Sequence, residues 1–119
     1  QKRPGLEQIA KVPFRGRIEQ VLDASDTGDE AFLDTTALVA SLDLIVSSDS
    51  MNAHLAGALG RPTFVALRKI PDWRWLLGRD DCPWYPTARL FRQTSEGDWQ
   101  DVFRRIAVAA SAQAGWSAK

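Results

Sequence analysis

The pattern of apolar and polar residues between Leu42 and Leu67 predicts a strand, a short helix and a second strand. Asp43–Ser47 is a brief apolar run with polar residues at both ends, and Thr63–Leu67 is a second run rich in β-branched and aromatic side chains. Strands of a parallel sheet that is covered on both faces have this composition. We therefore expect a parallel βαβ unit, around which the rest of the chain is organised.

The helix predicted between these strands has clear ends and a surface of small residues. Asp49 and Ser50 can cap its first amides, and Gly60 can end it. Four small residues let such a helix lie close to a sheet: Ala53, Ala56, Gly57 and Gly60. Its amino end would then point free amides at the carboxyl edge of the strands, where open α/β sheets bind ligands. An anion, in the first place a phosphate, is expected there.

Outside this unit the sequence continues to alternate between helix and strand. Before this unit we expect a short helix at Leu6–Lys11, a strand at Arg17–Leu22 and a polar loop at Asp23–Glu30. A helix from Asp34 to Leu42 should follow and pack through Ala37, Leu38 and Ser41. After the unit we expect a strand at Arg89–Arg92 and a helix from Trp99 to about Ser111 that is capped by Asp98. This alternation predicts the α/β class, with a Rossmann-like doubly wound parallel sheet. At 119 residues, the chain is expected to be one truncated domain over residues 1–119, since it begins with Gln rather than Met.

The segment Ile70–Pro86 contains three Trp, one Tyr and three Pro among its seventeen residues. Aromatic clusters of this kind are more often packed against a core than free to bind a ligand. We therefore expect the indoles of Trp73, Trp75 and Trp84 to be buried. Arg74 lies between two of them, so its side chain should point away from theirs, toward solvent or a ligand.

Composition and charge narrow the function. Fifteen basic and fifteen acidic residues cancel, which argues against nucleic acid or anionic lipid as a partner. Residues 61–79 nevertheless hold five bases, whereas residues 18–60 hold none. Cys82 is the only cysteine, so no internal disulfide can form and a reducing, cytoplasmic location is expected. One His and one Cys make no usual zinc cluster, and no apolar run approaches the ~20 residues of a transmembrane segment.

Three polar residues at the predicted helix start carry the candidate chemistry. Ser50 can offer its hydroxyl and the amides that follow it to a phosphate oxygen, and His54 can place an imidazole beside them. The same residues also have an ordinary structural explanation, with Asp49 and Ser50 as helix caps and His54 as a hydrogen-bonded packing residue. The chain has no GxGxxG or GxxxxGKS/T motif and no grouped nucleophile, base and acid, so this is the candidate site.

Five segments occur in this order along the chain: LDLIVSSDSMNAHLAGALGRPTFVAL, PDWRW, PWYP, ARLFRQ and GDW. With these segments the chain resembles the C-terminal half of bacterial glycosyltransferases related to the lipopolysaccharide heptosyltransferases, of the glycosyltransferase family 9 type, and the likeness covers nearly all of the chain. It is nearest to the versions fused to tetratricopeptide repeats. The family pattern of Asp, Thr or Ser, two variable positions, a small residue and His is matched by Asp49, Ser50, Ala53 and His54, with the small-residue helix at Ala56–Gly60.

This resemblance implies a partial GT-B fold, in which two Rossmann-like domains face each other and the C-terminal one binds the nucleotide-sugar donor. The chain would be the donor-nucleotide-binding half of a hexosyl or heptosyl transferase, with the donor as substrate and no metal or other cofactor. The residues implied around the donor are Asp49, Ser50, Met51, Asn52 and His54, with Arg68, Lys69 or Arg74 as charge partners. An upstream acceptor domain would supply the catalytic base. The 119 residues alone should therefore transfer no sugar, and their uncovered sheet edge should favour self-association.

Two residues depart from the family pattern. Met51 stands where heptosyltransferases often have Gly, directly after the Asp-Thr pair, and Arg68 stands where the repeat-fused relatives usually have Pro. A bulky side chain beside the donor and a new charge would change donor choice or abolish activity. The alternative hypothesis is a non-catalytic α/β module that senses phosphate or binds another protein.

Overall fold

The structure of the chain is a computed structural model that describes residues 6–21 and 32–114. Its contacts divide the chain into two units, residues 1–38 and 39–119, and each is described by itself. The single domain expected over residues 1–119 stays a prediction.

In the first unit, short 3₁₀ helices occur where the sequence predicts a helix and a strand. η1 (Leu6–Lys11) and η2 (Arg15–Arg17) follow each other through backbone hydrogen bonds. The helix predicted at Leu6–Lys11 is confirmed as helical. The strand predicted at Arg17–Leu22 is wrong over its described residues, because Arg17 ends η2 and residues 18–21 form no strand. An alternating pattern becomes a strand only where another strand pairs with it, and none does so among residues 6–21.

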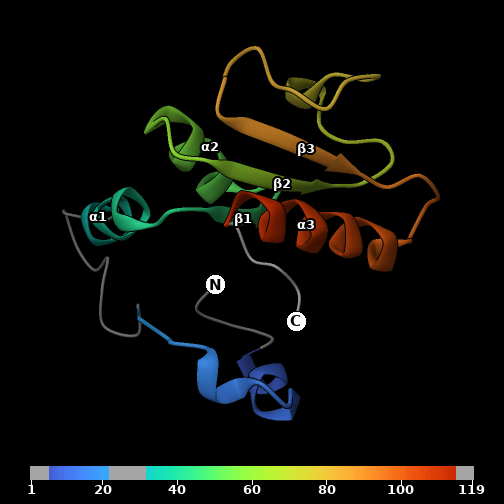
Figure 1. Ribbon diagram of the computed structural model, residues 1–119. Helices are drawn as coiled ribbons and strands as arrows, with labels where there is room; N and C mark the ends of the chain where they lie inside the picture. The colour runs from blue at the N-terminus through green and yellow to red at the C-terminus, as the bar shows by residue number, and fades with distance from the viewer. Residues whose placement is uncertain (1–5, 22–31, 115–119) are drawn as a thin grey trace. The chain divides into compact units, whose positions relative to one another are not determined.

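Three parallel strands form the sheet of the second unit, in the order β1-β2-β3 (Figure 1). They are β1 (Ile45–Ser48), β2 (Thr63–Leu67) and β3 (Ala88–Arg92). β2 has the predicted bounds, and β3 starts one residue before the predicted strand. β1 starts two residues after its predicted position. All five residues of β2 are buried, and this explains why its apolar, β-branched composition predicts the bounds of the strand correctly.

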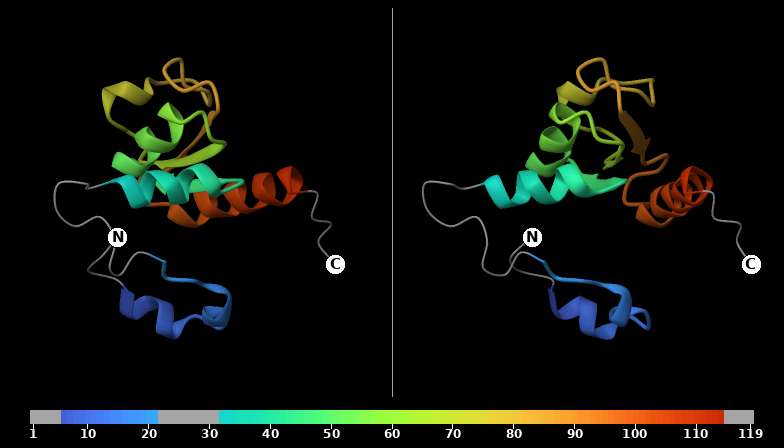
Figure 2. Two further views of the ribbon diagram at one scale, coloured as in Figure 1. Left: turned by 90° about the vertical axis from the view of Figure 1, so that its left-hand side faces the viewer. Right: turned by 60° about the vertical axis from the view of Figure 1, so that its left-hand side comes forward.

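Different elements cover the two faces of this sheet (Figure 1 and Figure 2). α2 (Met51–Ala58) connects β1 to β2 and packs on one face, together with the long loop after β2 that contains the 3₁₀ turn η4 (Trp73–Trp75). α3 (Trp99–Gln113) packs on the other face. Successive β2 residues alternate between the two cores, with Val65 on the α2 side and Phe64 on the α3 side. This is a small α/β fold, compatible with a Rossmann-like arrangement.

α1 (Leu33–Ser41) precedes β1 and differs from the helix that the sequence predicts there. Asp34 lies inside its first turn rather than at its cap. Ala37 and Ser41 are exposed, so the predicted packing stripe is wrong at these two positions, whereas Leu38 is half-buried. Val39 is buried and packs against apolar residues of β1 and α2. The loop predicted at residues 23–30 lies outside the described residues. No helix among residues 6–21 and 32–114 has the length and apolarity that crossing a membrane requires.

The side chain of Arg92, the last residue of β3, holds the long loop after β2 against the sheet. Its guanidinium donates hydrogen bonds to three backbone carbonyls of the loop, those of Trp75 (3.3 Å), Leu76 (2.8 Å) and Arg79 (2.9 Å). Partial burial lowers the pKa of the Arg92 guanidinium from its ordinary value. A charged donor that bonds to several carbonyls in this way fixes the position of an irregular loop.

Candidate functional site

The start of α2 lies just beyond the carboxyl end of β1, as the sequence predicts. Ser50 occupies the cap position with an extended backbone (φ −153°, ψ 168°), but its side chain makes no capping hydrogen bond. Its hydroxyl is hydrogen-bonded to the hydroxyl of Ser47, with 2.9 Å between the two oxygens. The expected side-chain cap by Ser50 is therefore wrong, because a second serine three residues earlier competes for the hydroxyl. The first amides of α2 are left without that cap.

Three of the predicted donor-binding residues flank this helix start on the surface. Asp49 precedes the cap, and Met51 and Asn52 form the beginning of the first turn. All three are exposed, and the Met51 side chain is 46% accessible. Their side chains are therefore accessible to a ligand at the helix start.

His54 lies one turn into α2 and is held by two aromatic residues from the long loop. Its Nδ1 is hydrogen-bonded to the Tyr85 hydroxyl at 3.0 Å, and its ring stacks on Trp75 with centroids 4.9 Å apart and planes 21° apart. Gly57 provides the room for this arrangement, since a Cβ at that position would overlap the Tyr85 ring. The imidazole is thus fixed in place. Its Nε2 makes no hydrogen bond within the described residues.

An aromatic cavity of about 220 Å³ opens beside His54. Its lining residues, apart from His54, all come from the long loop: Trp73, Arg74, Trp75, Trp84 and Tyr85. Two aromatic rings in van der Waals reach of one imidazole form a surface that suits the apolar face of a sugar or a base.

The prediction that all three tryptophans of this loop are buried is wrong for two of them. Trp75 is 1% exposed and lies in the core, whereas Trp73 is 69% and Trp84 59% exposed. The core beneath the loop encloses one indole, packed against Ala53 of α2 and neighbouring strand residues. Trp84 is fixed at the surface by a hydrogen bond from its Nε1 to the carbonyl oxygen of Arg74 (3.0 Å).

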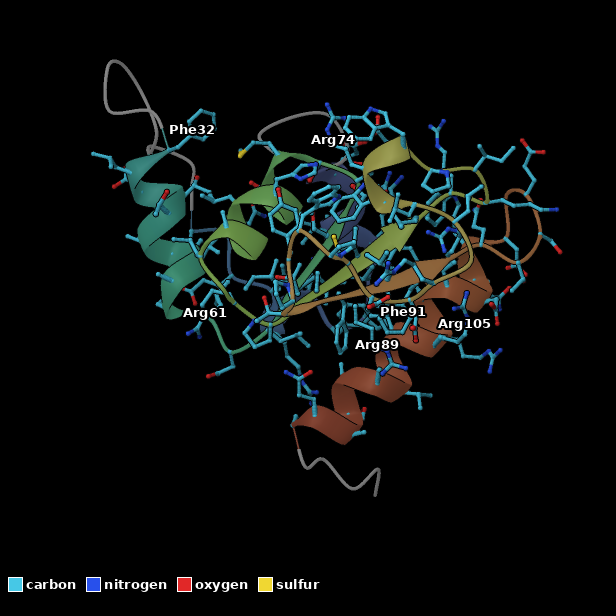
Figure 3. The ribbon with its side chains drawn as sticks, turned by 90° about the horizontal axis from the view of Figure 1, so that it is seen from above. Phe32, Arg61, Arg74, Arg89, Phe91 and Arg105 are labelled. Atoms are coloured by element: carbon cyan, nitrogen blue, oxygen red, sulfur yellow. The ribbon has the colours of Figure 1, made fainter. Side chains whose placement is uncertain are left out.

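The expected orientation of Arg74 away from the indoles is also wrong. Arg74 lies on the 3₁₀ turn η4 (Figure 3). Its guanidinium carbon is 4.9 Å from the centroid of the Trp73 ring, and its Nη1 is 2.9 Å from a carboxylate oxygen of Asp72. The backbone amide of Arg74 donates to the same carboxylate, and this bond, with the smaller effect of the guanidinium, lowers the Asp72 pKa. Asp72 is therefore ionised at neutral pH and partly offsets the charge of Arg74.

Arg68 and Lys69 lie in a different place, where they line a polar cavity of about 380 Å³ at the carboxyl ends of β2 and β3. The remaining lining residues are Ile70, Gln93, Glu96, Gly97 and Trp99. The structure thus separates the three predicted charge partners into two groups, with Arg74 beside His54 and the other two in this cavity. Sequence analysis missed Gln93, because nothing in the pattern around a single glutamine shows that it will be buried.

The described residues contain no group of three or more His, Cys, Asp or Glu side chains placed to bind a metal. Cys82 is a free thiol in the core.

Comparison with known proteins gives a partial likeness. The chain is 37% identical over 76 residues to protein FlbA of Caulobacter vibrioides. The match covers 64% of this chain and 12% of FlbA, so this chain corresponds to a small part of that protein. No family model matches the chain, and no solved structure matches it.

Proposed function

We propose that the chain is the donor-nucleotide-binding part of a metal-independent, GT-B-type glycosyltransferase related to the heptosyltransferases. It would hold the diphosphate of a UDP-, GDP- or ADP-sugar at the start of α2. An acceptor domain elsewhere in a larger protein would supply the catalytic base. The parallel sheet with covered faces supports this proposal, because it is compatible with the Rossmann-like donor domain of such enzymes.

The observation that carries the proposal is the arrangement at the amino end of α2. The Ser50 hydroxyl is turned to Ser47, so the first amides of the helix keep their partial positive charge for an anion. His54 follows one turn later, with Nδ1 bonded to Tyr85. When the Tyr85 hydroxyl donates to Nδ1, the proton of the neutral imidazole is on Nε2, which can donate to a phosphate oxygen.

The basic residues would provide the longer-range attraction. Arg68 and Lys69 follow β2, whose carboxyl end is at the same edge of the sheet as the end of β1. Neither forms a salt bridge with another described residue, so their positive charge is not offset by a direct partner. Arg74, on the other side of His54, would contact the donor with a charge that Asp72 partly offsets.

Calorimetric titration of UDP, GDP and ADP into the protein that contains this chain tests the proposal. His54→Ala should weaken the best-binding nucleotide by about tenfold or more, since it removes a hydrogen bond to a charged group. Its melting temperature should also fall, because the ring stacks on Trp75 and bonds to Tyr85, so the two proteins are compared at a temperature where both are folded. Gln113→Ala, an exposed change at the far end of α3, is the control and should bind as the wild type does. Equal affinities for His54→Ala and the wild type would contradict the proposal.

Exposed apolar side chains favour a second candidate, a non-catalytic protein-binding module. Four of them come from residues 70–84 and are more than half exposed: Ile70, Trp73, Leu77 and Trp84. Apolar side chains gathered on one surface loop are typical of contact sites for other proteins. Failure of all three nucleotides to bind, together with loss of a bound partner protein in Trp73→Asp, would favour this candidate.

A further inference from the structure

We propose that the polar cavity is a second, separate binding site, for a small molecule that carries an oxyanion beside a flat apolar group. The oxyanion would be a phosphate ester or a carboxylate. The cavity lies where β2 and β3 end and α3 begins, and its volume of about 380 Å³ is within the usual range for small-molecule sites. This inference does not rest on the glycosyltransferase proposal, which concerns the start of α2.

A buried donor without a partner is the first observation. Gln93 is 5% exposed and lines the cavity. Its Oε1 accepts hydrogen bonds from the backbone amides of Lys69 (3.3 Å) and Gly97 (3.4 Å), which fixes the orientation of the side-chain amide. Its Nε2 is buried and has no hydrogen-bond partner among the described residues. A buried amide donor costs free energy until an acceptor reaches it, so an acceptor oxygen on the ligand is expected here.

The charges around the cavity identify the acceptor as an oxyanion. Arg68 and Lys69 are both exposed and neither forms a salt bridge with a described residue. Glu96 is the acid among the lining residues. The carboxylate of Asp98, next to the cavity, accepts a hydrogen bond from the backbone amide of Asp101 as the cap of α3, so the positive end of the helix partly offsets its charge. Two cations and one amide donor, against Glu96 and this partly offset carboxylate, favour a negatively charged ligand.

An aromatic wall gives the site its preference for a flat group. Trp99 lines the cavity and is 37% exposed. The Phe103 ring supports it from the next turn of α3, with the two ring centroids 6.2 Å apart. A supported indole at the edge of a cavity is a stacking surface for a planar ligand group. The ligand therefore combines a planar ring with an anion, as an aryl carboxylate or an aryl phosphate does.

Nuclear magnetic resonance on the ¹⁵N-labelled chain tests the site, with phenyl phosphate and benzoate as anionic probes and phenol as the neutral control. Either anion should shift the side-chain amide signals of Gln93 and the indole signal of Trp99, and phenol should not. Preference for phenyl phosphate identifies a phosphate ester, and preference for benzoate identifies a carboxylate. Equal shifts with phenol, or no shift with any probe, would overturn the proposal.

Substitutions can distinguish the effect of losing the Gln93 amide donor from the effect of changing the net charge of the chain. Gln93→Glu keeps the acceptor for the amides of Lys69 and Gly97 but replaces the donor with a carboxylate, so the anion should bind about tenfold more weakly or worse. Gln113→Glu adds the same charge at an exposed, distant position and should bind normally. Arg68→Ala, an exposed change that should not disturb folding, should also weaken the binding of the anion. Unchanged affinity in both Gln93→Glu and Arg68→Ala would overturn the site.

The two proposals fail separately. His54→Ala should leave the binding of phenyl phosphate and benzoate unchanged. Gln93→Glu places a carboxylate in the same cavity as Arg68 and Lys69, so it should weaken nucleoside diphosphate binding much less than it weakens the binding of the aryl anions. Loss of the aryl anions in His54→Ala would place them at the start of α2 and overturn the separate site, whatever the outcome of the nucleotide titration.

Discussion

Trp73 and Trp75 lie two positions apart in one loop and have opposite surroundings, with exposed fractions of 69% and 1%. We expect Trp75→Ala to lower the free energy of unfolding by about 3–5 kcal/mol, because loss of the ring leaves a cavity in the core. Trp73→Ala should cost about 1 kcal/mol or less, since most of the ring is exposed and its contact with Arg74 is at the surface. Urea unfolding followed by circular dichroism measures both, and similar losses for the two variants would contradict this assignment.

Sequence could not show which of these indoles is enclosed. The loop has no helical or strand periodicity that would place one ring inside and its neighbour outside. The selection comes from the fold, because Trp75 is the ring that meets His54 of α2 and the apolar side chains of β2 and β3. The pattern identified an ordered aromatic segment correctly and misplaced two of its three tryptophans.

Gly57 determines how closely Tyr85 can approach α2, and a methyl group there should be harmful. Ala is ordinarily about 1 kcal/mol better than Gly inside a helix, but the added Cβ would overlap the Tyr85 ring. Gly57→Ala should therefore destabilise the chain by about 1–3 kcal/mol. Gly16→Ala, where a Cβ meets nothing nearby, is the control for thermal unfolding. A Gly57→Ala variant as stable as the wild type would show that the ring is not seated on α2.

Among the helices and strands, those that the sequence predicts correctly are the ones whose own residues determine their burial or their ends. β2 is buried throughout, and α3 has a capping Asp98 followed by a regular apolar stripe, so both were found. The strand predicted at Arg17–Leu22 failed because strand formation depends on a partner. The cap predicted for Ser50 failed because Ser47 takes its hydroxyl, a contact that exists only once β1 and α2 have formed.

Asp101 in the first turn of α3 links the stability of this element to pH. Hydrogen bonds from Arg105 (2.8 Å) and then Arg104 (2.5 Å) lower the Asp101 pKa below its ordinary value of 3.8. A carboxyl group whose pKa is lowered in the folded state stabilises that state at pH values above the ordinary pKa. This contribution disappears as the pH falls through the lowered pKa. The advantage of the wild type over Asp101→Asn should therefore shrink as the pH falls from about 5 to about 2.

Urea unfolding at a series of pH values measures this effect. The control removes the donors, since Asp101→Asn made in an Arg104→Ala, Arg105→Ala background should show much less dependence on pH. An equal dependence on pH in both backgrounds would assign the effect to other groups.

In the sheet as a whole, the two outer strands differ in their backbone pairing. The outer side of β3 carries an isolated antiparallel bridge between Arg89 and Asp81, whereas β1 pairs only with β2 among the described residues. Val46 of β1 is 48% exposed. We expect the 119-residue chain to self-associate through this edge, and Val46→Lys should reduce association because charged edge strands resist pairing. Light scattering over a range of concentrations, with the exposed Val108→Lys on α3 as control, tests this. A wild-type chain that stays monomeric at high concentration would contradict it.

The proposed function requires the first amides of α2 to hold the phosphates of a nucleotide. The most direct measurement is the ¹⁵N–¹H spectrum of the labelled chain during titration with UDP, GDP and ADP, and with uridine as a control without phosphate. We expect at least one nucleoside diphosphate to shift the backbone amide signals of Met51 and Asn52 and the ring signals of His54, and uridine to leave those amide signals unchanged. Shifts confined to other parts of the chain, or no shift with any of the three nucleotides, would contradict it.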